Sequence, residues 1–198
     1  MQSATLITNT IDTGHFGDQD PERTLATIQN VAAPIGLPRI AQRSGPANAQ
    51  RFENLADLKP TAQRLLYFSE AGSDYYITVD GQTEQLFDPN NPPAIVTKQG
   101  AVEDWTIQNR TAEVHEFHIH QVHFLLEALN GVVIPKKQQQ FYDTYQVPYW
   151  LGGGDYPSIT VRMDFRGSIT GDFVYHCHIL KHEDRGMMAI IRVKKRKT

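Results

Sequence analysis

The sequence predicts an all-β fold, a Greek-key sandwich or barrel, that follows an irregular segment. Two observations predict it. From Arg64 onward the chain consists of short runs rich in valine, isoleucine, tyrosine, phenylalanine and threonine, each bounded by glycine, proline, asparagine or aspartate. No long segment has the 3.6-residue period of an amphipathic helix. Eight or nine short strands over roughly 130 residues are typical of two-sheet β folds.

The expected strands follow one another closely. In chain order they are 64–70, 74–82, 94–100, 101–110, 118–131, 141–148, 158–165, 171–179 and 187–194. Residues 1–60 differ. Apart from a short β-type run at 4–8, they are rich in proline, glycine, alanine, aspartate and glutamine, and a loop this long is unusual within one compact domain. We therefore interpret 1–60 as the end of a preceding domain plus a linker, and 61–198 as one β domain.

Composition excludes several classes of protein. Lysine and arginine number 19 against 22 aspartates and glutamates, and the net charge of −3 argues against a nucleic-acid binder. No apolar run reaches the length of a membrane span, and the N-terminal residues lack the pattern of a signal peptide. The single cysteine excludes an internal disulfide framework.

The histidines are unevenly distributed. His15 is isolated, and we expect it to be an incidental surface residue. The other seven form two tight clusters, and the second contains the lone Cys177. These seven are His115, His118, His120, His123, His176, His178 and His182. A structural zinc site is an alternative, but such sites usually use two or more thiolates. The pattern therefore favours a different metal.

Strand geometry divides these side chains between two faces. Successive side chains of a strand point in opposite directions. In the tripeptide "HCH", His176 and His178 point one way and Cys177 the other. In "HEFHIH", His115 has the opposite parity to the two later histidines. The sequence thus predicts two sites on opposite sides of two strands. The histidine side would present His118, His120, His176 and His178.

The cysteine side has the composition of a blue-copper centre. Cys177, His182 and Met187 form a C-x4-H-x4-M loop, and His115 would come from a distant strand. A trigonal His2Cys plane with a weak axial methionine is the ligand set of electron-transfer copper sites. Met188 has the opposite parity, and we expect it to pack in the core. On the other face, four imidazoles suit copper that binds oxygen, and the "HCH" backbone joins the two sites.

These motifs resemble those of the multicopper oxidases. "HEFHIHQVHF" and "HCHILKHEDRGMM" are similar to the two C-terminal copper motifs of the laccase group, and the second is especially similar to the bacterial spore-coat-type laccases. The resemblance covers about residues 60–195 and implies a cupredoxin-like C-terminal domain. The region from Ala4 to Ala26 resembles the end of the preceding domain of that family.

The resemblance implies a role for each motif residue. Matching positions are His115, Cys177, His182 and Met187 for type 1 copper, His118 for type 2 copper, and His120, His176 and His178 for type 3 copper. His123 matches a motif histidine that is not a ligand. Glu183 matches a glutamate implicated in proton delivery, and a surface acidic pair with Asp184 is the alternative. Glu116 stands where many laccases have proline.

The implied function is that of a copper oxidase. The family oxidises small aromatic or metal-ion donors at type 1 copper and reduces O2 to water at a trinuclear cluster. Half of the cluster histidines come from H-x-H motifs of an N-terminal domain, and this chain contains no further H-x-H motif. We therefore expect a complete type 1 site and half a cluster, with N-terminal cupredoxin domains or another subunit as the partner. The resemblance also implies a periplasmic or secreted protein.

Three alternatives remain open at this stage. Two copies of the chain could complete the cluster at a two-fold interface. A nitrite-reductase-like copper protein would use interfacial type 2 copper, although that family resembles H-C followed by a residue other than histidine. Finally, the chain could be a non-catalytic electron-transfer or copper-carrying protein. Tyr149, Trp150 and Tyr156 could flank a donor pocket, but we expect them to pack in a loop.

Overall fold

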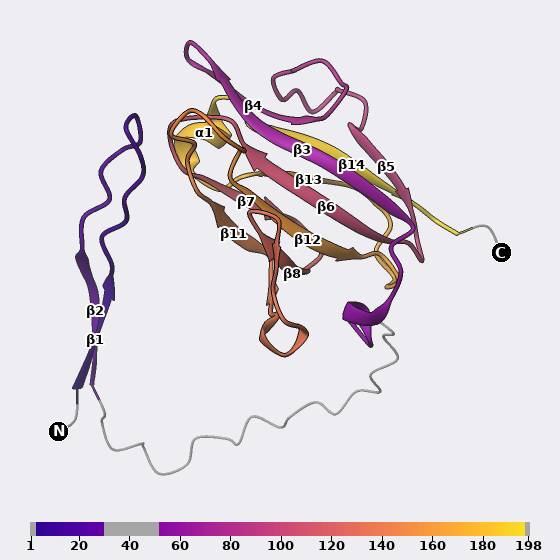
Figure 1. Cartoon of the computed structure of the whole chain (residues 1–198), viewed down its shortest axis with the longest axis horizontal. Coiled ribbons are helices and arrows are strands. Elements are labelled where there is room, and N and C mark those ends of the chain that lie inside the picture. The colour runs from indigo at the N-terminus through magenta and orange to yellow at the C-terminus, as the bar shows by residue number, and fades with distance from the viewer. Residues whose placement is uncertain (1–2, 30–51, 197–198) are drawn as a thin grey trace.

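The structure, a computed structural model, describes residues 3–29 and 52–196, and most of it is two β-sheets packed face to face (Figure 1). The larger sheet has the order β10-β8-β12-β6-β3-β4, with β9 paired to β8. Its strands are β3 (Ala62–Ala71), β4 (Asp74–Val79), β6 (Val102–Asn109), β8 (Phe124–Leu129), β9 (Val132–Val133), β10 (Phe141–Tyr142) and β12 (Ser158–Asp164). The β3–β6 pair is parallel, and the other pairs are antiparallel.

The smaller sheet has the order β11-β7-β13-β14-β5. Its strands are β5 (Ile95–Lys98), β7 (His115–Ile119), β11 (Thr144–Val147), β13 (Gly171–Cys177) and β14 (Met188–Lys194). Both histidine clusters begin in this sheet, because β7 and β13 are neighbours. Strand β14 pairs with β13 antiparallel and with β5 parallel.

Aromatic side chains fill the space between the sheets. Trp105 of β6 has no exposed surface and lies 5.6 Å, between ring centroids, from Tyr175 of β13. Phe117 of β7 lies 6.4 Å from Trp105 and 5.7 Å from Phe124 of β8. Each such large apolar side chain contributes about 1.5–3 kcal/mol when it is buried. The period-two burial of β5, β6 and β7 follows from this arrangement, since only one face of each strand meets the core.

Helical structure is sparse in the described part of the chain. It consists of α1 (Leu180–Asp184) and two 3₁₀ turns, η1 (Leu55–Asp57) and η2 (Lys136–Gln138). The prediction of an all-β two-sheet fold is therefore confirmed. Within the described ranges, no helix has the length and apolar character that a bilayer span requires.

The N-terminal region forms a separate hairpin. Strands β1 (Ser3–Thr8) and β2 (Arg23–Gln29) pair only with each other among the described residues. The run at 4–8 was expected to be a strand; β2 was not anticipated, since 1–60 was expected to be largely irregular. Residues 30–51 of that expected linker lie outside the described residues, and residues 55–57 form η1. The loop of the hairpin reaches the sandwich through a bridge between Gly14 and Glu113.

Two expected strands are each two strands in the structure. The run 118–131 is interrupted between β7 and β8, because Gln121 adopts a left-handed backbone conformation with φ 66°. The run 141–148 divides at Asp143, where β10 pairs with β8 in one sheet and β11 pairs with β7 in the other. Period-two patterns carry no information about such a change of sheet, so the sequence did not reveal it.

Candidate metal centre

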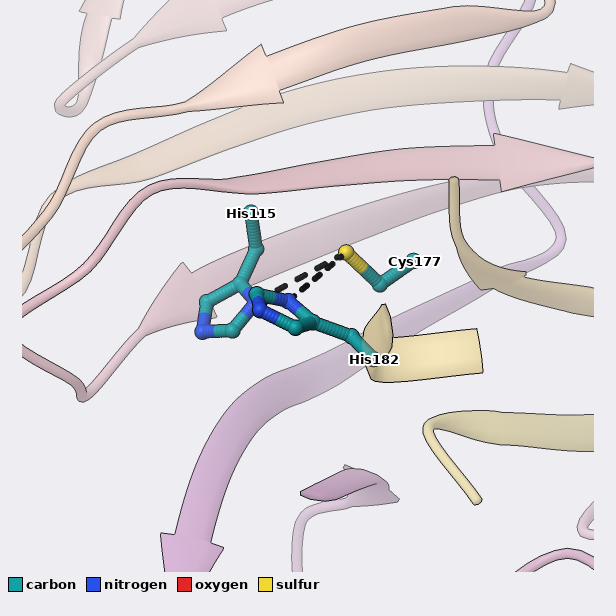
Figure 2. A group of neighbouring side chains, drawn as sticks. All are labelled: His115, Cys177 and His182. Carbon is teal, nitrogen blue, oxygen red and sulfur yellow. Dashed lines mark hydrogen bonds between the residues drawn. The ribbon is translucent and has the colours of Figure 1, made fainter. Parts of the chain in front are cut away.

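The Cys177 sulfur faces the imidazoles of His115 and His182 (Figure 2). The sulfur is 3.6 Å from Nδ1 of His115 and 3.5 Å from Nδ1 of His182, and the two Nδ1 atoms are 3.0 Å apart. All three residues are buried, with at most 2% of their surface exposed. His115 begins β7, Cys177 ends β13 and His182 lies on α1, so three elements converge on one point.

Hydrogen bonds to the second nitrogen of each imidazole leave Nδ1 as the free ligand atom. Nε2 of His182 is 3.2 Å from a carboxylate oxygen of Glu113, which accepts only. Nε2 of His115 is 2.8 Å from the Thr111 hydroxyl and 3.2 Å from a Glu70 carboxylate oxygen. The Thr111 proton has its own acceptor in Asn109 Oδ1, at 2.8 Å. Both Nε2 atoms therefore carry the proton.

The charges and donor atoms of His115, Cys177 and His182 suit a soft cation. Two Nδ1 lone pairs face each other at 3.0 Å, which is repulsive unless a positive ion lies between them. Burial and the neighbouring His182 lower the pKa of His115 to about 3, so the imidazole is neutral. Burial raises the pKa of the Cys177 thiol to about 12. Imidazole nitrogens and a thiolate are the donors that copper prefers, so the set fits a copper ion.

Aromatic rings fix the planes of both imidazoles. The Tyr75 ring stacks on His182 at 4.4 Å with an interplanar angle of 14°. The Phe68 ring stacks on His115 at 4.8 Å with an angle of 27°. Both rings come from the larger sheet, so the packing of the two sheets orients these side chains. The backbone amide of Glu116 also donates to the Cys177 sulfur, at 3.4 Å.

Met187 lies beside this group. Its side chain has no exposed surface, and its carbonyl accepts from the Cys177 amide at 3.1 Å. Its own amide donates to the His182 carbonyl at 3.0 Å. Met187 is thus tied to both neighbours by the turn that follows α1. Met188, of opposite parity, pairs with His176 across the strands and is half-buried.

The histidine side lies on the other face of the same strands. His176 of β13 is directly opposite His118 of β7, and their ring centroids are 5.1 Å apart. Nε2 of His120 is 3.2 Å from Nε2 of His176. The His178 ring lies 5.0 Å from the His118 ring. The structure therefore brings all four predicted side chains together, and His120 and His178 are exposed at the surface.

For His118 and His176, on this face, the free ligand atom is Nε2. The Nδ1–H of His118 donates to the Asp143 carbonyl at 2.8 Å. The Nδ1 of His176 lies 2.9 Å from the Cys177 carbonyl, which accepts, and 3.3 Å from a Glu183 carboxylate oxygen. Burial lowers the pKa of both imidazoles, so both favour the neutral form. His118 and His176 therefore present Nε2, whereas His115 and His182 present Nδ1.

Two hollows border these groups. One, of about 300 Å³, lies between the loop of the N-terminal hairpin and the Cys177 side, and its wall includes Asp18, Glu113 and His182. The other, of about 310 Å³, is lined by His118, His120 and His123. His123 is exposed and lies 4.0 Å from an Asp143 carboxylate oxygen. Trp150 and Tyr156 pack against each other at 4.7 Å.

Several residues at the site were not predicted. Glu113 precedes His115 by two positions and shares its strand parity, which is a weak signal in the sequence. Glu70, Phe68 and Tyr75 come from the larger sheet, and no spacing rule connects them with the histidine motifs. The segment around Thr13 also contacts the site, since its carbonyl accepts from the Val114 amide at 2.9 Å.

Fold and site together define a cupredoxin-like domain, which confirms the predicted fold class. The chain belongs to the multicopper oxidase family, because the family model for multicopper oxidases matches residues 57–197. The resemblance seen in the copper motifs is thereby confirmed.

Similarity to individual proteins agrees with this assignment. The chain is 30% identical over 151 residues to a multicopper oxidase of Staphylococcus haemolyticus (strain JCSC1435), covering 74% of this chain and 30% of that protein. It is 27% identical over 164 residues to a laccase of Bacillus stratosphericus, covering 69% of this chain and 29% of that protein. The chain thus spans about 30% of the length of these relatives.

Solved structures show the same fold. The laccase from Pediococcus acidilactici Pa5930 is similar with a TM-score of 0.55 and 27% identity, covering 83% of this chain and 31% of that one. The multicopper oxidase from Campylobacter jejuni, described as a metallo-oxidase, is similar with a TM-score of 0.63 over 98% of this chain and 41% of that one. Its identity of 24% supports the fold alone.

Proposed function

We propose that this chain is the C-terminal part of a laccase-like multicopper oxidase. Residues 61–198 would be its C-terminal cupredoxin domain, and residues 1–60 the end of the preceding domain plus a linker. The observation that carries the proposal is the arrangement around one tripeptide. The Cys177 sulfur faces two buried imidazoles, while His176 and His178, its neighbours in the chain, face a second group of imidazoles.

His115, Cys177, His182 and Met187 would hold type 1 copper. The support is the convergence of three of these side chains within 3.6 Å and the burial of all four. His118 would be a ligand of type 2 copper, and the type 3 ligands would be His120, His176 and His178. When bound, copper supplies the single-electron chemistry by which a small aromatic or metal-ion donor is oxidised and O2 is reduced to water.

The chain itself would provide two connections between the sites. The first is covalent, through the backbone from Cys177 to His176 and to His178. The second is the hydrogen bond from His176 Nδ1 to the Cys177 carbonyl, at 2.9 Å. Both are short, and the His176 side chain that forms the second is buried.

Glu183 would be a proton relay for the histidine side. Its carboxylate lies 3.3 Å from His176 Nδ1, and 28% of the side chain is exposed. It also lines a hollow of about 500 Å³ with Asp74 and Asp184. A carboxylate that contacts both solvent and a ligand imidazole can exchange protons between them, and the reduction of O2 to water consumes protons.

The histidine side requires a partner. Among the described residues, four imidazoles meet there, and His120 and His178 are at the surface. N-terminal cupredoxin domains of the same protein would supply the remaining ligands. The N-terminal hairpin fits this proposal. Leu6 is 51% and Leu25 58% exposed, and exposed apolar side chains on a two-stranded hairpin suggest that further strands would cover them. Family resemblance favours a periplasmic or secreted location.

Self-assembly is a second candidate. The exposed histidine face favours it, because two such faces related by a two-fold axis would bring two sets of imidazoles together. In this case the chain alone would be an oxidase.

One preparation tests these proposals. The chain is loaded with copper, its copper content and mass in solution are measured, and O2 consumption is followed with a phenol as donor. We expect about one tightly bound copper per monomer and no O2 consumption until the N-terminal domains are added. A stable oligomer that consumes O2 by itself would support self-assembly instead. If the folded chain binds no copper at either the Cys177 side or the histidine side, both proposals are contradicted.

A further inference from the structure

We infer that Glu113 is a positioning residue that lowers the reduction potential of the proposed type 1 centre by placing a buried carboxylate on His182. This inference rests on the proposed function, because it requires copper at Cys177. It assigns a role to a residue outside the ligand set.

The contact is close and protected from water. A Glu113 carboxylate oxygen lies 3.2 Å from His182 Nε2, and the two side chains are only 4% and 3% exposed. A negative charge acts more strongly on its neighbours in such surroundings than in water, because the effective dielectric constant is lower. A carboxylate that accepts the second N–H of a ligand imidazole also raises the basicity of the ligating nitrogen.

The backbone holds Glu113 in this position. Its carbonyl accepts from Asn109 Nδ2 at 2.8 Å and lies 2.9 Å from the Thr111 hydroxyl oxygen. Gly14 of the hairpin loop forms a bridge to it on the other side. The Asn109 amide is fully buried and also donates to the Val147 carbonyl, at 3.2 Å. The Glu113 backbone is therefore held from two directions, and its carboxylate contacts His182.

Glu70 makes a comparable contact in a different environment. Its carboxylate lies 3.2 Å from His115 Nε2, but its side chain is 27% exposed. Solvent screens this charge, and the Thr111 hydroxyl shares the same nitrogen at 2.8 Å. The two carboxylates thus form an internal comparison, in which the buried one has the larger effect on the metal.

The direction of the effect follows from charge. Cupric copper carries one more positive charge than cuprous copper, so a fixed negative charge on the ligand shell stabilises the oxidised state. Removal of that charge favours the reduced state and raises the potential. Glu113→Gln is the appropriate change, because the glutamine oxygen can still accept from His182 while the charge is lost.

The test is a redox titration of copper-loaded chains, followed by the intensity of the visible band. We expect Glu113→Gln to increase the preference for cuprous over cupric copper about tenfold, which is about 59 mV for a one-electron couple. Glu70→Gln should raise the reduction potential by less than Glu113→Gln does. Asp18→Asn is the control. Asp18 lines the same hollow as Glu113 and His182, but its side chain is 77% exposed, so solvent screens its charge. It should leave the potential unchanged.

Outcomes separate this inference from the proposed function. If the unsubstituted chain shows no thiolate-to-copper band, both are overturned. If it shows the band but Glu113→Gln matches Asp18→Asn in potential, the role of Glu113 alone is overturned. If Glu113→Gln does not fold, Glu113→Asp provides the same comparison, because its shorter side chain withdraws the charge from Nε2. Glu113→Asp should then raise the potential, and an unchanged value would overturn the inference.

The metal-free chain gives a second measurement. Nitrogen-15 NMR of the imidazoles reports which ring nitrogen carries the proton. His182 should be the Nε2–H tautomer in the unsubstituted chain and should become a mixture in Glu113→Leu. An unchanged tautomer in Glu113→Leu would show that Glu113 does not position this ring.

Discussion

His118 and His176 lie directly opposite each other on β7 and β13, and the same register places Cys177 opposite Phe117 on the other face. Adjacent residues of β13 therefore face different groups: His176 faces the imidazoles, and Cys177 is a buried thiol on the other face. This register would let one tripeptide serve both proposed sites, whose ligands would then be separable by mutation.

Cys177→Ser should remove one site and leave the other. A hydroxyl is a poor copper ligand in place of a thiolate, so the intense visible band should disappear. Copper held more weakly by the histidine side should be unaffected, since its ligand atoms are on the opposite face. Copper content together with the absorption spectrum checks this. The matched variant is His118→Ala, which should keep the visible band and reduce copper on the histidine side. A coloured Cys177→Ser protein would show that Cys177 is not the thiolate ligand.

Copper binding should release the proton of Cys177. Burial raises the pKa of this thiol to about 12, so it is protonated in the metal-free chain, and a thiolate ligand must lose that proton. The apparent affinity should therefore rise about tenfold per pH unit through neutral pH. His115, with a pKa of about 3, has no proton to release there. Titration in weakly buffered solution measures the protons released, and Cys177→Ser should release about one fewer per chain. Equal release by both proteins would contradict this.

Glu127 should make stability depend on pH far from the metal site. Its carboxylate lies 3.1 Å from Arg162, which Asp104 also binds, at 2.7 Å. Burial and the Asp104 charge raise the pKa of Glu127 to about 7. The unfolded chain loses this proton near 4.5, the ordinary pKa of a glutamate, so the folded state binds more protons between pH 4.5 and about 7. The free energy of unfolding should therefore fall as pH rises from about 4.5 to about 7.

Glu127→Gln should remove this pH-dependent part of the free energy of unfolding, which is on the order of 2 kcal/mol. Urea unfolding of the metal-free chain at several pH values gives the comparison, and the difference between the two proteins isolates this residue from the histidines. Glu22→Gln, at an exposed position, should leave the pH dependence as it is. If the difference between wild type and Glu127→Gln is the same at every pH, the carboxyl is not shifted.

Gly186 should be sensitive to substitution because it forms the turn between His182 and Met187. Its φ is 101°, and an added Cβ would lie 2.7 Å from the Leu86 side chain. Gly186→Ala should cost about 1–3 kcal/mol of stability and weaken type 1 copper binding. Gly171→Ala is matched, because Gly171 has φ 105° and nothing within 4 Å of an added Cβ. Chemical unfolding should show the larger loss for Gly186→Ala, and equal losses would mean that the contact with Leu86 has no effect.

Much of the fold was predictable because strands impose a period of two. The alternation in "HCH" was sufficient to separate Cys177 from His176 and His178, and the register of β7 and β13 agrees with it. Strand boundaries were less accurate. The left-handed residue Gln121 ends β7 within a run that appears continuous in sequence.

The surroundings of the candidate centre were not predictable in the same way. Tyr75 and Glu70 contact His182 and His115 only because the larger sheet packs on the smaller one. Such contacts depend on the order of strands in space, which local patterns do not contain. Glu113 is intermediate, since it shares the parity of His115 but reaches His182 across the fold.

The absorption spectrum of the copper-loaded chain tests the central claim most directly. If Cys177, His115 and His182 bind one copper ion, the folded chain should show an intense thiolate-to-copper band in the visible spectrum. Its mass and copper content should show that the metal is bound to the monomer. A correctly folded, copper-loaded chain without this band would contradict the account.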